Sequence, residues 1–453
     1  MSSQSAAGPD LPLQPKFRVA IVGGGPGGLA LAISISKFSH PKAPIVVDLY
    51  EAQPEIGTVG AGITIWPRTR ALLNELGVMA HFKGELNAQV EPGKAGKGVM
   101  LRKSNERQGY PIYHMPTPSN PMMLHRSDFL HALQNEMPAA PQCTTYTSKR
   151  LISLTHDKLD GSVTLHFSDG STSTADVVIG ADGIRSAVRA SMLSEDERIE
   201  PEWPGVIAYR AMIPSETLES HSIGRDHPVR NTAHIYCGIG KHFVTYPIRR
   251  GDFVNVVAFV TLPNSGKRFE GKWVRDVPVE EVREAFAGWE PDVENVLQCV
   301  ETTSAWAVHI VYGAPRCASG RVAILGDAMH ATRPHFGAGA GQAMEDAYVL
   351  ARLLTHPSTT RSTLPQALQA YNRSRLDFST ELVHKTNHVG SLYEFTGVPV
   401  PSGAHDHDIL EKWRKEVYEL WQFQMDEHGA EGFWRDAETY LQAFLSATRR
   451  AAL

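Results

Sequence analysis

The N-terminal part of the chain alternates short apolar runs with one longer apolar stretch. Residues 17–22 and 45–50 are β-rich, and residues 29–35 between them are apolar over about two helical turns. Two later apolar runs, 176–180 and 320–325, end close to an aspartate and are typical of buried strands. The pattern predicts an α/β fold that opens with a strand–helix–strand unit.

The middle of the chain, between about residues 200 and 312, is rich in strands instead. The predicted strands cover residues 206–211, 234–237, 242–248 and 253–260. The turn Arg249-Arg250-Gly251-Asp252 joins the last two of them. We expect an antiparallel sheet that forms a platform over a bound cofactor.

The C-terminal part is predicted to be helical around residues 365–380, 409–425 and 432–445, with an irregular stretch that begins at Tyr393 and ends near His407. One set of apolar side chains recurs at helical spacing: Leu410, Trp413, Val417, Leu420 and Phe423. These residues are most simply core or dimer contacts. Closure of an active site is the alternative interpretation.

Composition narrows the class of protein. A chain of 453 residues is expected to form two or three packed units. Its net charge of −5 gives no electrostatic reason to expect a nucleic acid or an anionic membrane as partner. The four cysteines have no ligand-like spacing, so we expect reduced thiols and no metal site.

Neither a secretory signal nor a membrane span is expected. Residues 1–15 lack a basic and an apolar region and are interpreted as a flexible leader. The longest apolar stretch, 253–262, is about half the length of a membrane-spanning helix and is interrupted by Asn255. We expect a cytoplasmic protein that is a monomer or a homodimer.

A glycine-rich turn follows the first predicted strand. Gly23, Gly25 and Gly28 match the GxGxxG pattern, in which they permit a tight turn, close approach of a pyrophosphate and close packing of the helix. Glu51 ends the second strand, 23 residues after Gly28. A carboxylate there can bind both ribose hydroxyls of adenosine and would repel a 2′-phosphate, which favours FAD or NAD over NADP. The alternative is an ordinary solvated glutamate at a strand end.

Two later carboxylates favour FAD. Asp182 and Asp327 each follow a buried strand, and a helix that includes Gly339 and Ala340 begins soon after Asp327. Asp327 can bind ribityl hydroxyls, while free helix N–H groups favour negative charge near the N1–C2=O edge of the isoalloxazine. Simple capping of a turn or helix is the alternative for both aspartates.

These residues resemble the group A flavoprotein monooxygenases, the fold family of para-hydroxybenzoate hydroxylase. The three signatures of that family occur in its order: Gly23–Gly28, Asp182-Gly183 and Gly326-Asp327. The resemblance covers roughly residues 17–400, and the segments 59–63 and 337–346 look similar to fungal salicylate-hydroxylase-like enzymes. It implies a Rossmann-like FAD-binding domain with an inserted antiparallel substrate domain and a C-terminal helical segment.

The expected domain boundaries follow from this architecture. A discontinuous FAD-binding domain covers residues 16–105, 120–195 and 313–380. The substrate domain covers 106–119 and 196–312, and a C-terminal helical region covers 381–453.

The resemblance also assigns cofactor contacts. It implies that Glu51 binds the adenosine ribose, that Gly62 lies on the flavin side and that Arg126 contacts FAD. Asp327 is implied to hold the ribityl chain. Asp182 is implied to lie near both FAD and the path of the nicotinamide cofactor. Two positions depart from the family pattern, Arg68 where many relatives carry Asn and Ala338 where bacterial members often carry Gln.

A phenolic substrate needs an apolar pocket with a few aimed polar groups. The available groups are Tyr209, Arg210, His234, Tyr236, Tyr246 and His335. Arg210 is the first choice for pairing with a carboxylate or phenolate, although it also suits an internal ion pair or a place on the flavin ring. Tyr246 fits a core position or the site equally well. Pro334 is expected to line the flavin face, and His335 is a candidate proton relay or an exposed loop histidine.

The resemblance implies FAD- and NAD(P)H-dependent hydroxylation of a hydroxybenzoate-like phenol through a C4a-hydroperoxyflavin. No second GxGxxG occurs, so NADH or NADPH is expected as a transient co-substrate. Loss of a carboxylate as CO2 would give salicylate 1-hydroxylase or 4-hydroxybenzoate 1-hydroxylase chemistry. A ring hydroxylase or epoxidase of a fungal secondary-metabolite pathway remains an alternative.

Two other classes are less well supported. A flavin-dependent halogenase would carry a WxWxIP segment, which this sequence lacks. A non-catalytic dinucleotide-fold protein, like the Rab escort and GDI-like proteins, would not be expected to retain both Asp182 and Asp327. A preparation that is yellow with bound FAD would exclude it.

Overall fold

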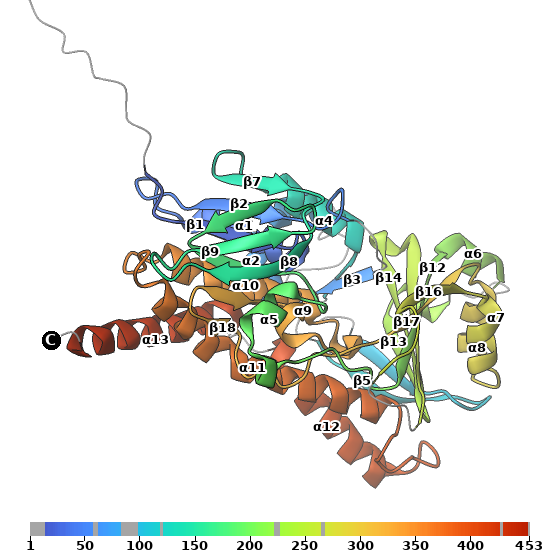
Figure 1. The fold of residues 1–453 in the computed structure, drawn as a ribbon. Coiled ribbons are helices and arrows are strands. Elements are labelled where there is room, and N and C mark those ends of the chain that lie inside the picture. The colour runs from blue at the N-terminus through green and yellow to red at the C-terminus, as the bar shows by residue number, and fades with distance from the viewer. Residues whose placement is uncertain are drawn as a thin grey trace, which may run out of the picture.

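The computed structural model describes residues 14–57, 62–82, 98–117, 121–221, 227–263, 268–425 and 429–451. Most of the expected leader, residues 1–13, and residues 59–61 of the segment before Gly62 lie outside these ranges. The ribbon separates into two sheet-containing parts joined along one side by long C-terminal helices (Figure 1).

A six-stranded sheet in the order β18-β19-β11-β1-β2-β7 forms the first part. Its strands are β1 (Arg18–Val22), β2 (Val46–Tyr50), β7 (Cys143–Tyr146), β11 (Val177–Gly180), β18 (Ala318–Ser319) and β19 (Val322–Ile324). All pairs are parallel except β18 with β19. The four strands predicted from the apolar runs therefore exist, and they are neighbours in one sheet.

Helices cover this sheet. Helix α1 (Pro26–Phe38) begins with a proline in its first turn, where the missing N–H costs no hydrogen bond. It packs against α10 (Gly339–Thr355). A separate antiparallel sheet of β8 (Leu151–His156), β9 (Val163–Phe167) and β10 (Thr172–Ala175) precedes β11 in the chain. The core of this part thus joins the N-terminal unit to segments more than 300 residues later in the sequence.

An eight-stranded sheet in the order β16-β17-β12-β15-β14-β13-β4-β5 forms the second part. Its strands are β4 (Val99–Lys103), β5 (Tyr110–Met115), β12 (Val206–Pro214), β13 (Ala233–Gly238), β14 (Lys241–Ile248), β15 (Phe253–Thr261), β16 (Val274–Val277) and β17 (Thr303–Ala307). Only β13 and β4 pair in parallel. The antiparallel platform predicted from the middle of the chain is therefore confirmed.

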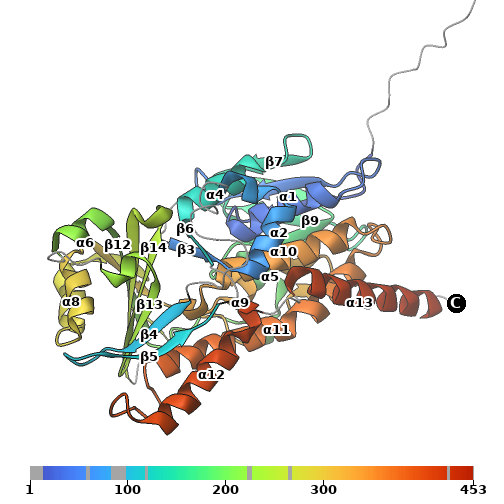
Figure 2. The same cartoon turned by 180° about the vertical axis from the view of Figure 1, so that it is seen from behind.

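Strand β4 differs from the expectation. We placed residues up to 105 with the dinucleotide-binding part, yet β4 hydrogen-bonds to β13 and β5 of the larger sheet. Its partner β13 lies more than 130 residues later, and the alternation of β4 does not reveal which sheet it joins. One face of this sheet carries the short helices α6 (Ser215–His221), α7 (Val279–Ala285) and α8 (Pro291–Gln298) (Figures 1 and 2).

The C-terminal helices are longer than predicted: α11 (Leu364–Tyr393), α12 (His407–Met425) and α13 (Gly429–Ala451). Of the periodic apolar residues, Leu410, Trp413, Val417 and Phe423 are buried and Leu420 is partly buried, all in one cluster with Ile235 and Phe336. The core interpretation of these residues is confirmed. Within the described residues, no helix is both long and apolar enough to span a bilayer.

Candidate flavin and substrate site

The glycine turn between β1 and α1 is built for a ligand at one position and for packing at the others. Gly23 has a φ of +111°, and a Cβ there would overlap the Ala181 carbonyl oxygen. A Cβ at Gly28 would overlap the carbonyl oxygen of Gly23. By contrast, a Cβ at Gly25 would meet no protein atom within 4 Å. The open space beside Gly25, at the start of α1, is where a pyrophosphate would meet free N–H groups.

Glu51 lies at the end of β2, directly beside this turn. Its carboxylate oxygens accept hydrogen bonds from the backbone N–H groups of Gly24 and Gln53, both at 2.8 Å. Each oxygen retains capacity for a further donor. The arrangement is compatible with ribose binding, and it also ties the turn to the second strand.

Asp182 caps a helix. Its carboxylate accepts hydrogen bonds from the Ser186 hydroxyl at 2.6 Å and from the backbone N–H groups of Ala187 and Val188 at 2.7 and 3.1 Å. Burial raises the pKa of Asp182, and these hydrogen bonds oppose the rise. Asp182 does not line the cavity of about 550 Å³ that lies between the two sheets, whereas the adjacent Gly183 does. The capping alternative thus describes its contacts in this structure.

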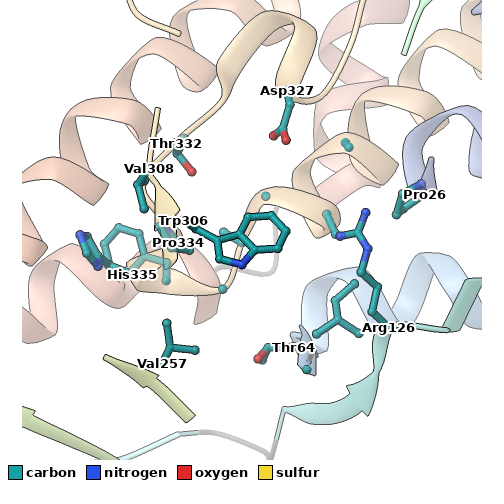
Figure 3. A pocket seen from close by; sticks show the side chains of 18 of the residues that line it. Pro26, Thr64, Arg126, Val257, Trp306, Val308, Asp327, Thr332, Pro334 and His335 are labelled. Carbon is teal, nitrogen blue, oxygen red and sulfur yellow. The ribbon is translucent and has the colours of Figure 1, made fainter. Parts of the chain in front are cut away.

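A cavity of about 550 Å³ lies between the two sheets. This volume falls within the usual range for small-molecule sites. In the view of Figure 3, Pro26 and Arg126 lie on one side of the cavity and His335 lies on the other. The cavity therefore runs from the glycine turn to the platform of the eight-stranded sheet.

The end of the cavity nearer the turn carries the polar groups expected of a flavin site. Predicted residues that line the cavity as a whole are Gly25, Gly62, Arg126, Asp327, Pro334, Gly339 and Ala340. Asp327 opens α9 (Asp327–His330) and is exposed to the cavity. Arg126 opens α4 (Arg126–Asn135). A free carboxylate for hydroxyls, a guanidinium, an open glycine cradle and the start of α10 fit the donor and acceptor set of FAD.

Strand alternation decides which sheet residues reach the cavity. Arg210 and Tyr246 line it, whereas Tyr209 lies on the opposite face of β12. The Tyr209 hydroxyl donates to Glu281 at 2.9 Å, and burial raises its pKa. Tyr209 was therefore wrong as a site residue, because adjacent residues of a strand point to opposite faces. His234 and Tyr236, which also do not line the cavity, stack on each other.

Arg210 has no paired anion among the residues that the structure describes. Its guanidinium lies 4.6 Å from the centroid of the Trp306 ring, and its Nε is buried without a hydrogen-bond partner. Burial lowers the pKa of Arg210, the phenol of Tyr246 opposes this, and the charge of Arg126 adds to it. Two guanidinium groups thus make this region of the cavity favourable for an anion.

Tyr246 closes the cavity where β3 (Gly62–Ile65) approaches the sheet. A Cβ at Gly62 would come within 2.7 Å of the Tyr246 hydroxyl, so only glycine allows this approach. The Gly62 N–H donates to Asn255 Oδ1 at 2.9 Å, and Asn255 Nδ2 is buried without a partner. Sequence reasoning missed Asn255 as a site residue. The signal was its position as the one amide inside an apolar run.

His335 lies in the turn Pro334–Phe336 and is buried, so the exposed-loop interpretation was wrong. Neither ring nitrogen has a hydrogen-bond partner. Burial lowers the pKa of His335 well below its usual value, and the charges of His242 and Arg333 act in the same direction. His335 therefore contributes a neutral imidazole to the cavity wall, with both of its ring nitrogens buried.

Arg68 belongs to a buried ion-pair network and does not line the cavity. Its Nε and Nη2 donate to the Glu345 carboxylate at 2.7 and 2.8 Å, and Nη1 donates to the Phe423 carbonyl. Arg375 extends the network through Asp346 at 2.7 Å. Arg68, which stands where many relatives carry asparagine, thus connects α2 (Pro67–Glu75) with α10 and with the end of α12.

Seven aromatic lining residues were not predicted as site residues: Trp66, Phe259, Trp273, Trp306, His309, Phe336 and Trp421. Trp421 comes from α12, so that helix contributes to the cavity wall as well as to the core. Its indole N–H donates to the Tyr393 hydroxyl at 2.8 Å. The helical spacing placed the face of α12 correctly but gave no sign that one residue on it reaches the cavity.

Comparison with known proteins agrees with this geometry. The family model described as FAD binding domain matches residues 16–386. The chain is 35% identical over 426 residues to a salicylate hydroxylase of Pseudomonas putida, covering 92% of this chain and 94% of that protein. It is 34% identical over 422 residues to a 6-methylsalicylate 1-monooxygenase of Aspergillus terreus, covering 91% and 88%.

Solved structures of known proteins also resemble this fold. A salicylate hydroxylase in complex with substrate superposes with a TM-score of 0.77 at 29% identity, covering 93% of this chain and 98% of that chain. HpxO of Klebsiella pneumoniae, complexed with FAD and uric acid, has a TM-score of 0.65 at 23% identity, covering 93% and 96%, and shares the fold.

Proposed function

The chain belongs to the FAD-dependent aromatic monooxygenases, and on that premise we propose that it hydroxylates an ortho-hydroxybenzoate with loss of the carboxylate as CO2. The observation that carries this proposal is Arg210, a cation with a buried, unpartnered Nε on the cavity face of the platform. The two relatives named above act on salicylate and 6-methylsalicylate, and they support the same substrate class.

Arg210 and Tyr246 would bind and orient the substrate. A planar guanidinium pairs with a carboxylate through two parallel hydrogen bonds, which fixes the ring as well as the charge. Tyr246 offers a hydroxyl on the neighbouring part of the wall. The carboxylate would supply the anion that Arg210 lacks in the structure.

His335 would remove the phenol proton. The O–H bond breaks, its electron pair remains on oxygen, and the proton moves to a ring nitrogen of His335. The resulting phenolate is a stronger carbon nucleophile ortho to the oxygen. Because the pKa of His335 lies well below its usual value, its neutral form is available over the whole neutral range.

The glycine turn, Glu51, Arg126, Asp327 and the start of α10 would hold FAD. When bound, FAD would accept a hydride from NAD(P)H and activate O2. The overall reaction consumes the hydroxybenzoate, NAD(P)H, O2 and two protons. It yields a catechol, CO2, water and NAD(P)+. The apolar wall, which includes Val257, Phe259 and Trp421, would keep water from the reacting carbon.

We also propose a cytoplasmic location and the domain boundaries given above, with β4 reassigned to the substrate part. All four cysteines are free and buried, which suits a reducing compartment.

The test is a panel of phenolic acids with the flavin-loaded protein. NAD(P)H oxidation, product and hydrogen peroxide are measured for 2-hydroxybenzoate, 4-hydroxybenzoate and phenol. The proposal predicts stimulated oxidation with catechol formed only from 2-hydroxybenzoate. Hydroquinone from 4-hydroxybenzoate would move the assignment to the para isomer, and stimulation with peroxide alone would contradict it.

A further inference from the structure

The short helix α9 presents a carboxylate to the cavity. It has four residues and opens with Asp327, which lines the cavity. The Asp327 carboxylate points toward the cavity in Figure 3. Among the described residues no side chain caps the N-terminus of α9, and a helix of one turn is not stable by itself. The position of Asp327 therefore depends on contacts between α9 and other elements.

A single buried carboxylate of α10 contacts both ends of α9. Oδ2 of Asp346 accepts a hydrogen bond from the backbone N–H of Gly326, directly before α9, at 3.0 Å. The same oxygen lies 2.6 Å from Nε2 of His330, the last residue of α9. The side chain of Asp346 is fully buried, and that of His330 is almost fully buried. Asp346 thus holds α9 at its start and at its end.

The face of α10 that carries Asp346 also contacts the start of α9. Gly326 has a φ of +59°, and a Cβ there would lie 2.8 Å from the Cβ of Ala343. A Cβ at Gly339 would lie 3.9 Å from Oδ1 of Asp327, so that carboxylate sits beside the N-terminus of α10. Gly339, Ala343 and Asp346 follow one another at spacings of four and three residues and share one helix face.

Asp346 is an ionised acceptor. Burial acts to raise the pKa of Asp346, but Arg375 and His330 outweigh this effect and lower the pKa to about 2. Nε of Arg375 donates to Oδ1 of Asp346 at 2.7 Å, which leaves Oδ2 for Gly326 and His330. Because an ionised carboxylate only accepts, Nε2 of His330 is the donor. Hydrogen bonds to an ionised acceptor are stronger than those between neutral groups, so both contacts restrain α9.

Neither Asp346 nor His330 lines the cavity, so an effect of either residue on bound FAD has to pass through α9. We propose that Asp346 and His330 position Asp327 for FAD by holding α9 against α10. This inference rests on the contact between Asp327 and FAD in the proposed function. Asp346 and His330 are positioning residues. If they served the fold alone, their loss would lower stability without acting through Asp327.

The experiment measures the Kd of FAD for the flavin-free full chain, followed by the change in flavin fluorescence on binding. His330→Phe keeps a ring of similar size and removes the N–H donor to Asp346. His330→Gln retains an N–H donor and is the conservative variant. His388→Phe is the matched control, because Nε2 of His388 also lies 2.6 Å from a carboxylate, that of Glu416, at an exposed position.

The first readout is the Kd of FAD for each single variant. Asp327→Ala removes the carboxylate itself and should raise the Kd about tenfold or more, the loss of a hydrogen bond to a charged group. His330→Phe displaces this carboxylate and should raise the Kd about fivefold or more, whereas His330→Gln and His388→Phe stay within about twofold of the wild type. A Kd of His330→Phe within about twofold of the wild type overturns the inference.

The second readout separates positioning from a general loss of stability. His330→Phe is combined with Asp327→Ala, and the Kd of FAD is measured for every member of this double-mutant cycle. If His330 acts through Asp327, His330→Phe changes the Kd by less than about twofold once the carboxylate is absent. An equal factor with and without the Asp327 carboxylate overturns the inference. The Tm of the flavin-free proteins records the loss of stability separately.

Asp327→Ala also separates this inference from the proposed function. If Asp327→Ala leaves the Kd of FAD unchanged, the proposed contact between Asp327 and FAD fails, and the inference fails with it. If Asp327→Ala weakens FAD binding and His330→Phe does not, the contact stands and the positioning role is refuted. If His330→Phe does not fold, as judged by Tm and circular dichroism, His330→Met is measured in the same cycle and decides.

Discussion

Replacing Arg210 with methionine separates substrate binding from stability, because the two effects have opposite signs. The guanidinium has a buried Nε without a partner, and burial lowers the pKa of the side chain. A methionine of similar length removes this unpaired polar group and retains contact with Trp306. We therefore expect Arg210→Met to keep or raise the Tm of the protein without substrate.

The binding effect follows from the contact that Arg210 would make. A hydrogen bond to a charged group contributes about 1.5–3 kcal/mol. Its loss corresponds to a rise in KM for 2-hydroxybenzoate of about 10-fold to about 150-fold. Phenol, which lacks the carboxylate, should show a change of less than about twofold.

The assay measures kcat and KM for both compounds by product formation, together with Tm with and without 2-hydroxybenzoate. The exposed Arg198 forms a surface ion pair with Glu200, so Arg198→Gln is the matched control and should behave as the wild type. An equal loss for phenol and 2-hydroxybenzoate in Arg210→Met would show that Arg210 shapes the cavity and does not recognise the carboxylate.

Three further predictions concern the cofactor turn, the buried network and pH. Gly23→Ala should give colourless, unstable protein, whereas Gly25→Ala, whose Cβ meets no protein atom within 4 Å, should fold with Tm near wild type but retain less FAD by absorbance. Arg68→Met removes one partner of the buried Glu345 carboxylate and should lower the free energy of unfolding, measured with urea, by about 3–5 kcal/mol. The control Arg373→Ala, at an exposed ion pair, should lower this free energy by less than about 0.5 kcal/mol. Because the pKa of His335 is lowered, the acid limb of kcat/KM for 2-hydroxybenzoate should fall well below pH 6.5, the ordinary histidine value; a limb at that value would contradict the assigned base.

Local patterns in the sequence indicated several residues that line the cavity, among them Gly25 and Asp327. Gly23 and Gly28 are fixed by backbone contacts within a few residues or one strand away, so a glycine pattern reports them directly. Asp327 follows β19 after two residues and opens α9, so the end of a predicted strand locates it. Such residues can be predicted from the sequence because the residues that would contact the cofactor lie in the same short segment as those that form the turn.

The residues on the substrate side of the cavity are positioned by contacts between remote segments of the chain, and the sequence alone does not reveal these contacts. Tyr209 and Arg210 are both polar residue types that suit a phenolic site, and only the structure of β12 decides that Arg210 faces the cavity. Glu394 lies 152 residues from His242, and nothing in either segment indicates that they meet. Trp421 reaches the cavity from α12, and the contacts of that helix with Arg68 and Tyr393 join remote parts of the chain.

We propose that the protein inserts one atom of O2 into an ortho-hydroxybenzoate and releases its carboxylate as CO2. The most direct measurement is a reaction of the flavin-loaded protein with 2-hydroxybenzoate, NAD(P)H and isotope-labelled O2, followed by mass analysis of the product and quantification of CO2. We expect catechol with one labelled oxygen and one CO2 for each NAD(P)H consumed. Unlabelled product, or NAD(P)H consumed with peroxide as the only product, would contradict it.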